Sequence, residues 1–124
     1  MQHSLGFLAV VDEARTRVNE VDLARARERL ANNPDAILMD VREDTEWAAG
    51  HAAGAIHLGK GILERDIESA MPDKAAEVIM YCGGGFRSVL TAEVAQRMGY
   101  TNVHSLIGGH KALVNAGWEL ESGE

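Results

Sequence analysis

Residues 78–88 read VIMYCGGGFRS, and this segment indicates how the chain folds. Its first four residues form an apolar run, which is typical of a buried β-strand. Ser88 opens a helical pattern in which apolar residues recur every four positions up to Met98. Cys82 therefore lies where a strand ends and a helix begins, in a loop with three consecutive glycines.

The surroundings of Cys82 favour a thiolate. A lone cysteine at a strand end is often a small buried hydrophobe. Here, however, the glycines let the loop turn its N–H groups inward, because glycine adopts positive φ without steric cost. The helix N-terminus and Arg87 would also favour an anion on the sulfur. We therefore expect Cys82 to be a reactive nucleophile.

Outside this segment, strands and helices alternate. Apolar runs predict further strands at residues 18–21, 36–41, 55–58 and 102–106. Helical spacing predicts helices at 7–18, from Asp22 to a stop at 32–35, at 62–71, 88–98 and 110–116, with a helical turn at 43–49. Residues from Gly117 onward are expected to be a tail. This order predicts an α/β fold with a parallel sheet between helices, and a ligand crevice at the carboxyl ends of the strands, where Asp40 and Cys82 lie.

Composition limits the functional classes. A chain of 124 residues with 46% hydrophobic and 5% aromatic residues predicts one domain with an aliphatic core. We expect residues 1–19 to be an N-terminal helical extension, either covering the core or forming a dimer, and residues 20–124 to be the domain. The net charge of −7 argues against nucleic-acid binding. No run approaches membrane-spanning length, and residues 5–11 lack the flanks of a signal peptide, so we expect a cytoplasmic protein.

Three groups of motifs occur in one order along the chain. The first comprises Asp40-Val41-Arg42-Glu43, Glu46-Trp47, Gly50-His51 and Gly54-Ala55-Ile56-His57. The second is Tyr81-Cys82 with Gly85 and Arg87-Ser88, and the third is Gly99-Tyr100, Val103, Leu106 and Gly108-Gly109. Together they resemble the single-domain rhodaneses, sulfurtransferases of the rhodanese superfamily, from about residue 20 to residue 120.

The resemblance implies a central parallel sheet with helices on both faces, and an active-site loop at the carboxyl end of a central strand. It also implies ping-pong chemistry, in which Cys82 takes a sulfane sulfur from thiosulfate or a persulfide and passes it to cyanide or a thiol. The loop would bind the Cys82 persulfide through Gly83, Gly84, Gly85, Phe86, Arg87 and Ser88. No cofactor or metal is expected.

Neighbouring residues receive supporting roles. Arg87 would orient the donor or steady the persulfide, with pairing to a nearby carboxylate as the alternative. We expect Asp40 and Arg42 to fix the shape of the loop from the adjacent strand end, and Ser88 to cap the helix. His51 and His57 are interpreted as structural, whereas His110 and Lys111 follow the last motif and are candidates for the pocket rim.

Three features refine this hypothesis. Four residues separate Cys82 from Arg87, where the related cell-cycle phosphatases have five, so the loop favours sulfur over phosphate. The loop also lacks the additional basic residue of efficient thiosulfate users, which favours a low-molecular-weight or protein persulfide as donor. Leu113 stands where the family often has tryptophan, and Trp118 is the candidate to fill that volume.

Two alternative functions and the oligomeric state remain open at this point. The protein could be a relay that delivers persulfide sulfur to a protein partner with little small-molecule turnover. It could also be a thiol redox sensor, although no resolving cysteine is present. Either a monomer or a homodimer fits the sequence.

Overall fold

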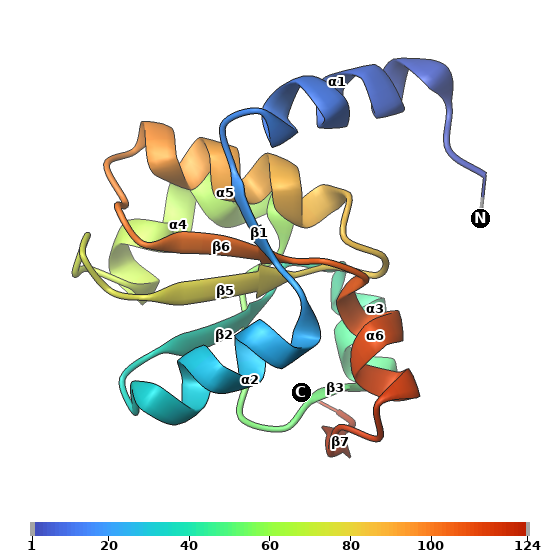
Figure 1. Cartoon of the computed structure of the whole chain (residues 1–124), viewed down its shortest axis with the longest axis vertical. Coiled ribbons are helices and arrows are strands. Elements are labelled where there is room, and N and C mark those ends of the chain that lie inside the picture. Colours follow the sequence, from blue (N-terminus) through green and yellow to red (C-terminus); the bar gives the residue numbers. More distant parts are fainter. Residues whose placement is uncertain (1, 124) are drawn as a thin grey trace.

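The computed structural model describes residues 2–123 and contains a five-stranded sheet in which every pairing is parallel. The strands are β1 (Asn19–Val21), β2 (Ile37–Asp40), β4 (Ile56–His57), β5 (Val78–Tyr81) and β6 (Val103–Leu106), in the spatial order β1-β6-β5-β2-β4. β5 is central and all four of its residues are buried, as its unbroken apolar run requires. The predicted α/β fold with a parallel sheet is confirmed (Figure 1).

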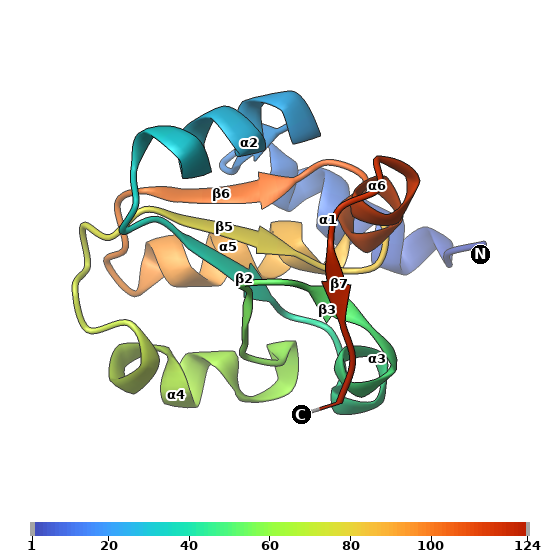
Figure 2. The same cartoon turned by 90° about the horizontal axis from the view of Figure 1, so that it is seen from below.

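Helices cover both faces of the sheet (Figures 1 and 2). They are α2 (Leu23–Asn32), α3 (Asp44–Ala49), α4 (Leu63–Ala70) after the 3₁₀ turn η1 (Lys60–Ile62), α5 (Arg87–Arg97) and α6 (Gly109–Asn115). α4 and α5 close one core with the side chains of Met80 and Val103. α2 and α6 close the other with Ile79 and Leu106. Alternate residues of each strand therefore enter opposite cores.

A further helix, α1 (Leu5–Arg15), lies on the outer side of α5 (Figure 1). Its hydroxyl cap is Ser4, whose side chain accepts a hydrogen bond from the N–H of Phe7. Val11 and Ala14 are buried against Val89 of α5. α1 thus covers the part of α5 that does not face the sheet. None of the helices within residues 2–123 is long and apolar enough to cross a membrane.

The expectation of a C-terminal tail is wrong. β7 (Leu120–Glu121) pairs antiparallel with β3 (His51–Ala52) in a small second sheet (Figure 2). The N–H of Gly123 also donates to the carbonyl of Ala48 at 2.8 Å. Because each of these strands has only two residues, no alternating pattern could reveal them.

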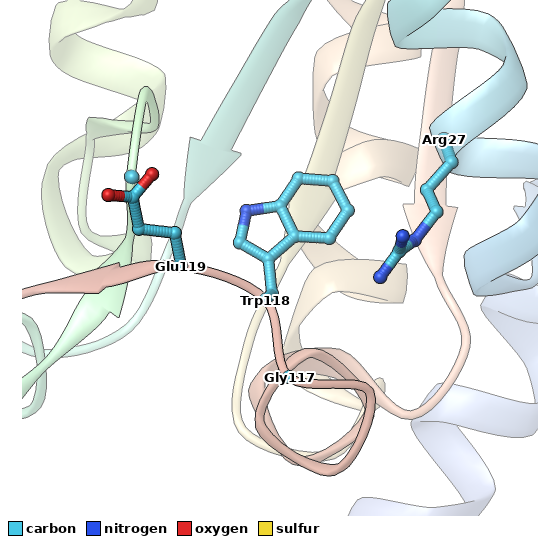
Figure 3. Close-up of a pocket in the computed structure, with 5 residues that line it drawn as sticks. Arg27, Gly117, Trp118 and Glu119 are labelled. Carbon is cyan, nitrogen blue, oxygen red and sulfur yellow. The ribbon is translucent and has the colours of Figure 1, made fainter.

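Trp118 lies between α6 and this small sheet (Figure 3). It packs against the core cluster that contains Leu113, as expected for a residue filling the neighbouring volume. The Arg27 guanidinium lies 5.0 Å from the centre of its ring, within the range of a cation–π contact. The C-terminal segment is therefore fixed to the domain through backbone and side-chain contacts.

Candidate active site

Cys82 follows the last residue of β5, at the carboxyl edge of the sheet. The residue is 1% exposed, and its sulfur forms two polar contacts. The N–H of Gly85 donates to Sγ at 3.2 Å, and the Oγ of Ser88 lies 3.5 Å from Sγ. The Gly85 N–H points its hydrogen at the sulfur, whereas the Ser88 hydroxyl can accept the hydrogen of a thiol or, after rotation, donate to the sulfur.

The loop between Cys82 and α5 is curled around the sulfur. Only Gly85 of the three glycines adopts positive φ, at +97°, and a Cβ there would lie 3.0 Å from the N atom of Gly108. Gly85 is therefore the position at which the turn requires glycine. Within residues 2–123, the N–H groups of Gly83, Gly84 and Phe86 donate to no protein acceptor.

The start of α6 braces this loop through the backbone. The N–H of His110 donates to the carbonyl of Cys82 at 2.7 Å, and the N–H of Lys111 donates to the carbonyl of Gly83 at 3.1 Å. Gly109 adopts a φ of +52°, and a Cβ on it would overlap the carbonyl oxygen of Cys82. The absence of a side chain at Gly109 therefore lets the two segments touch.

Arg87 is paired with a carboxylate, which is the alternative to its expected role on the donor. Its Nη1 and Nη2 donate to the two carboxylate oxygens of Glu46 at 2.8 and 3.0 Å. Glu46 lies in α3, where it also accepts the N–H of Glu43 at 3.0 Å in a capping box. The hydrogen bonds from Arg87 lower the pKa of Glu46 to about 2, and the same pair raises the pKa of Arg87. Glu46 carries its charge at neutral pH and balances that of Arg87.

The expected capping role of Ser88 is wrong. α5 begins at Arg87, its N-cap residue is Phe86, and no side chain caps it. Ser88 is fully buried, and its Oγ lies 2.8 Å from the Oγ of Ser105 as well as near Cys82 Sγ. Because Ser88 faces the sheet rather than the free N–H groups of the helix, its hydroxyl bonds across to β6 instead.

Asp40 and Arg42 contact a different segment from the one expected. They form a buried ion pair with a shortest distance of 2.8 Å, and Arg42 also donates to the carbonyl of Gly50 at 2.6 Å. Among the described side-chain hydrogen bonds, neither residue reaches the Cys82 loop. The pair fixes the connection between α3 and β3, because the Arg42 side chain turns toward Gly50.

The two histidines of the first motif hold a tryptophan. His51 stacks on one side of Trp47 with ring centres 3.4 Å apart, and His57 stacks at 4.8 Å. His51 also contacts the carbonyl of Trp47, and His57 contacts the carbonyl of Arg42. Residues 2–123 contain no cluster of three or more candidate metal-binding side chains.

A cleft of about 910 Å³ opens at Cys82. Its lining comprises Glu46, Cys82, Gly83, Gly84, Phe86, Arg87, Gly108, Lys111, Ala112 and Asn115, together with Gln2, His3, Ser4 and Phe7 from the N-terminal segment. Lys111 therefore lines the cleft, whereas His110 does not. Burial lowers the pKa of His110, and its Nδ1 has no hydrogen-bond partner within residues 2–123.

The N-terminal wall of the cleft could not be predicted from its sequence. The ring of His3 lies 4.5 Å from that of Phe86 and 5.2 Å from that of Phe7. The guanidinium carbon of Arg15 lies 5.1 Å from the centre of the Phe86 ring. No motif marks His3, because its place depends on how α1 packs against α5. Glu46 belongs to the first motif, but nothing in the sequence identified Arg87 as its partner.

Comparison with known proteins places this geometry in a family. The profile of the rhodanese-like domain matches residues 22–116. The chain is 30% identical to a sulfurtransferase of Allochromatium vinosum, with 86% of this chain and 98% of that protein aligned. It is 35% identical to the thiosulfate sulfurtransferase GlpE of Coxiella burnetii, over 64% of this chain and 73% of that one.

The solved structures contain a close match in shape. A Rhodopseudomonas palustris protein of unknown function, described as a possible tyrosine phosphatase, superposes with a TM-score of 0.84 and 28% identity, over 98% of this chain and 99% of that one. Family profile, relatives and fold agree with one another. The chain belongs to the rhodanese-like domain family.

Proposed function

We propose that this protein is a sulfurtransferase that carries a sulfane sulfur on Cys82 from a persulfide donor to a thiol acceptor. The observation that carries the proposal is the position of Sγ, at the floor of the cleft with the N–H of Gly85 3.2 Å away. The sulfurtransferases among its relatives support the same reaction class.

In the first half-reaction the Cys82 thiolate attacks the terminal sulfur of a donor R–S–SH. The bond between the two donor sulfurs breaks, the R–S⁻ group leaves and takes up a proton, and Cys82 becomes a persulfide. Because Cys82 is 1% exposed, the donor has to present the transferable sulfur at its tip. A terminal sulfane sulfur meets this requirement.

The loop then holds the terminal sulfur as an anion. The N–H groups of Gly83, Gly84 and Phe86 have no protein acceptor within residues 2–123 and are the proposed donors to that sulfur. In well-studied enzymes, one such preorganised donor contributes about 3 kcal/mol. In the second half-reaction an acceptor thiolate attacks the terminal sulfur, and the Cys82 thiolate leaves.

The lining of the cleft favours an organic donor over thiosulfate. Its volume of about 910 Å³ lies in the range of pockets for drug-sized ligands and far exceeds the size of thiosulfate. Glu46 neutralises Arg87, so a small dianion gains little from that guanidinium. Lys111 supplies a remaining positive charge, and the rings of Phe7 and Phe86 supply apolar surface. These features suit an organic persulfide with a carboxylate, such as glutathione persulfide.

Intact-mass measurement tests the proposal. The protein is incubated with glutathione persulfide or with thiosulfate, and the gain of one sulfur atom is followed over time. We expect faster loading from the organic persulfide and no loading of the Cys82→Ser variant. Absence of an adduct with both donors would overturn the proposal, as would an undiminished adduct on the serine variant.

The loaded protein then separates an enzyme from a relay. Cyanide and glutathione are each offered as acceptors, and we expect both to remove the sulfur. A stable adduct that neither acceptor discharges would instead support a carrier that delivers sulfur to a protein partner.

The donor class has its own variant. Lys111→Met removes the cleft charge and is expected to lower kcat/KM for glutathione persulfide by roughly fivefold, which corresponds to about 1 kcal/mol for one solvent-facing ion pair. Lys60→Met is the matched control, because Lys60 is exposed and does not line the cleft. An equal effect of both substitutions would contradict the role of Lys111.

Phosphatase activity is the competing function, since the R. palustris neighbour is described as a possible tyrosine phosphatase. The cradle here has only four residues between Cys82 and Arg87, and Arg87 is held by Glu46. We expect no hydrolysis of p-nitrophenyl phosphate. Turnover that depends on Cys82 would replace the sulfur-transfer proposal.

A further inference from the structure

A buried hydroxyl behind the reactive sulfur has no role in the chemistry described so far. Ser105 lies in β6, is fully buried, and shares the face of Val103, which packs in the core next to α5. Burying a hydroxyl costs free energy unless it is hydrogen-bonded. Its Oγ lies 2.8 Å from the Oγ of Ser88, which in turn lies 3.5 Å from Cys82 Sγ. The three side chains form one chain of contacts from β6 to the sulfur.

The hydrogen count of this chain matches the thiolate. Two contacts join the three groups, and within residues 2–123 Ser105 Oγ has no other hydrogen-bond partner. With a thiolate, Ser105 donates to Ser88 and Ser88 donates to Sγ, so both hydroxyl hydrogens are used. With a thiol there are three hydrogens for two contacts, so one is left without a protein acceptor. Unmet buried donors are unfavourable, so the arrangement favours the anion.

We propose that Ser105 is a positioning residue for the sulfur-transfer reaction, which orients the Ser88 hydroxyl toward Cys82 and so stabilises the Cys82 thiolate. This inference rests on the proposed function. It adds that the sulfur is stabilised from the sheet side as well as from the loop.

The hydroxyl pair of Ser105 and Ser88 acts at two stages of the reaction. Before loading, it raises the fraction of Cys82 present as the nucleophilic thiolate. During sulfur delivery, Cys82 Sγ becomes the leaving group as its bond to the terminal sulfur breaks. A stabilised thiolate leaves faster. Ser105 is therefore expected to accelerate discharge of the persulfide, although it never touches a substrate.

The pH dependence of Cys82 alkylation by iodoacetamide tests the role of Ser105. Ser105→Ala removes the hydrogen bond that orients the Ser88 hydroxyl toward the sulfur. We expect this loss to move the midpoint of the alkylation profile up by roughly half to one pH unit, and to slow persulfide discharge by about three- to tenfold. A purely structural role would leave the midpoint unchanged. Thr91→Val is the matched control, because Thr91 is also buried and contacts Ser88, but through the Ser88 carbonyl rather than its hydroxyl.

A second pair of variants keeps the test valid if the alanine variant folds poorly. Ser105→Thr and Ser105→Val have nearly the same shape and differ in the hydroxyl. The threonine variant is expected to retain the wild-type midpoint, and the valine variant to show the upward shift. Equal midpoints in this pair would overturn the proposal.

A double-mutant cycle isolates the path through Ser88. With Ser88→Ala present, Ser105→Ala is expected to add no further shift, because no hydroxyl remains to orient. If Ser105→Ala still shifted the alkylation midpoint fully in the Ser88→Ala background, the proposal that Ser105 acts through Ser88 would be overturned. Loading measured by intact mass remains a separate readout, so a protein that fails to accept sulfur would defeat the proposed function while the alkylation profile still decides the role of Ser105.

Discussion

Two carboxylate–guanidinium pairs stand at the carboxyl edge of the sheet, and they differ in their access to water. In Asp40–Arg42 the side chains are 0% and 6% exposed, and in Glu46–Arg87 they are 35% and 29% exposed. Both have a shortest contact of 2.8 Å. The same chemical pairing is thus enclosed in the fold in one place and lines the cleft in the other, and burial separates the two.

The energetic consequences follow from the same difference. Removing one partner of a buried pair leaves a charge without water or counterion, which is costly. A half-exposed pair contributes little to folding, because water solvates either partner when the other is lost. Its effect falls on the cleft, where Glu46 cancels the charge of Arg87.

The largest expected effect breaks the buried pair. Arg42→Met leaves Asp40 buried and unpaired, and should lower the free energy of unfolding by about 3–5 kcal/mol. Urea denaturation measures it. A loss below about 1 kcal/mol would show that the two pairs do not differ as their exposure suggests.

The next effect sharpens the role of the cleft pair. Glu46→Gln keeps an acceptor for the α3 capping box and frees the charge of Arg87, so kcat/KM for thiosulfate should rise by roughly fivefold, or about 1 kcal/mol. The free energy of unfolding should fall by less than about 1 kcal/mol. Asp44→Asn is the control, because it removes an equal charge from the same helix at a side chain that is 98% exposed. No gain over that control would contradict the charge-balance argument.

The smallest effect is the pH dependence of the cleft pair. The folded-state pKa of Glu46 is lowered to about 2 from a reference value of 4.5, so its contribution to stability is fully present above about pH 4.5 and is lost as the pH falls toward 2. The gap in unfolding free energy between wild type and Glu46→Gln should therefore stay constant from pH 7 to pH 5 and then shrink. A gap that is independent of pH down to 2 would remove Glu46 from the acid response.

The two ion pairs also differ in how far they could be predicted from the sequence. Asp40 and Arg42 are two residues apart at a strand end, so their proximity follows from local structure, although the segment they fix does not. Glu46 and Arg87 are separated by 41 positions, and only the packing of α3 beside the Cys82 loop brings them together. The parallel sheet and the position of Cys82 at its edge were predicted because apolar runs and glycine loops are local signals.

Short or tertiary features escaped prediction for related reasons. β7 has two residues, which is too few for a periodic pattern. The hydroxyl of Ser88 could satisfy either a helix end or a strand, and its burial decides for the strand. Nothing in the sequence singled out Ser105, because its strand also contains the polar residue His104 and its burial is known only from the fold.

In the Cys82 loop, the positions that set the shape of the backbone differ from those that are free to carry a side chain. Gly85 and Gly109 cannot gain a side chain without displacing backbone atoms. A Cβ on Gly83 would meet only the flexible end of Arg87, and one on Gly84 would meet only the Phe86 ring at ordinary contact distance. Neither of these two glycines has positive φ. The charge of the loop is therefore adjustable by single substitutions at Gly83 and Gly84, while the backbone frame around Cys82 stays intact.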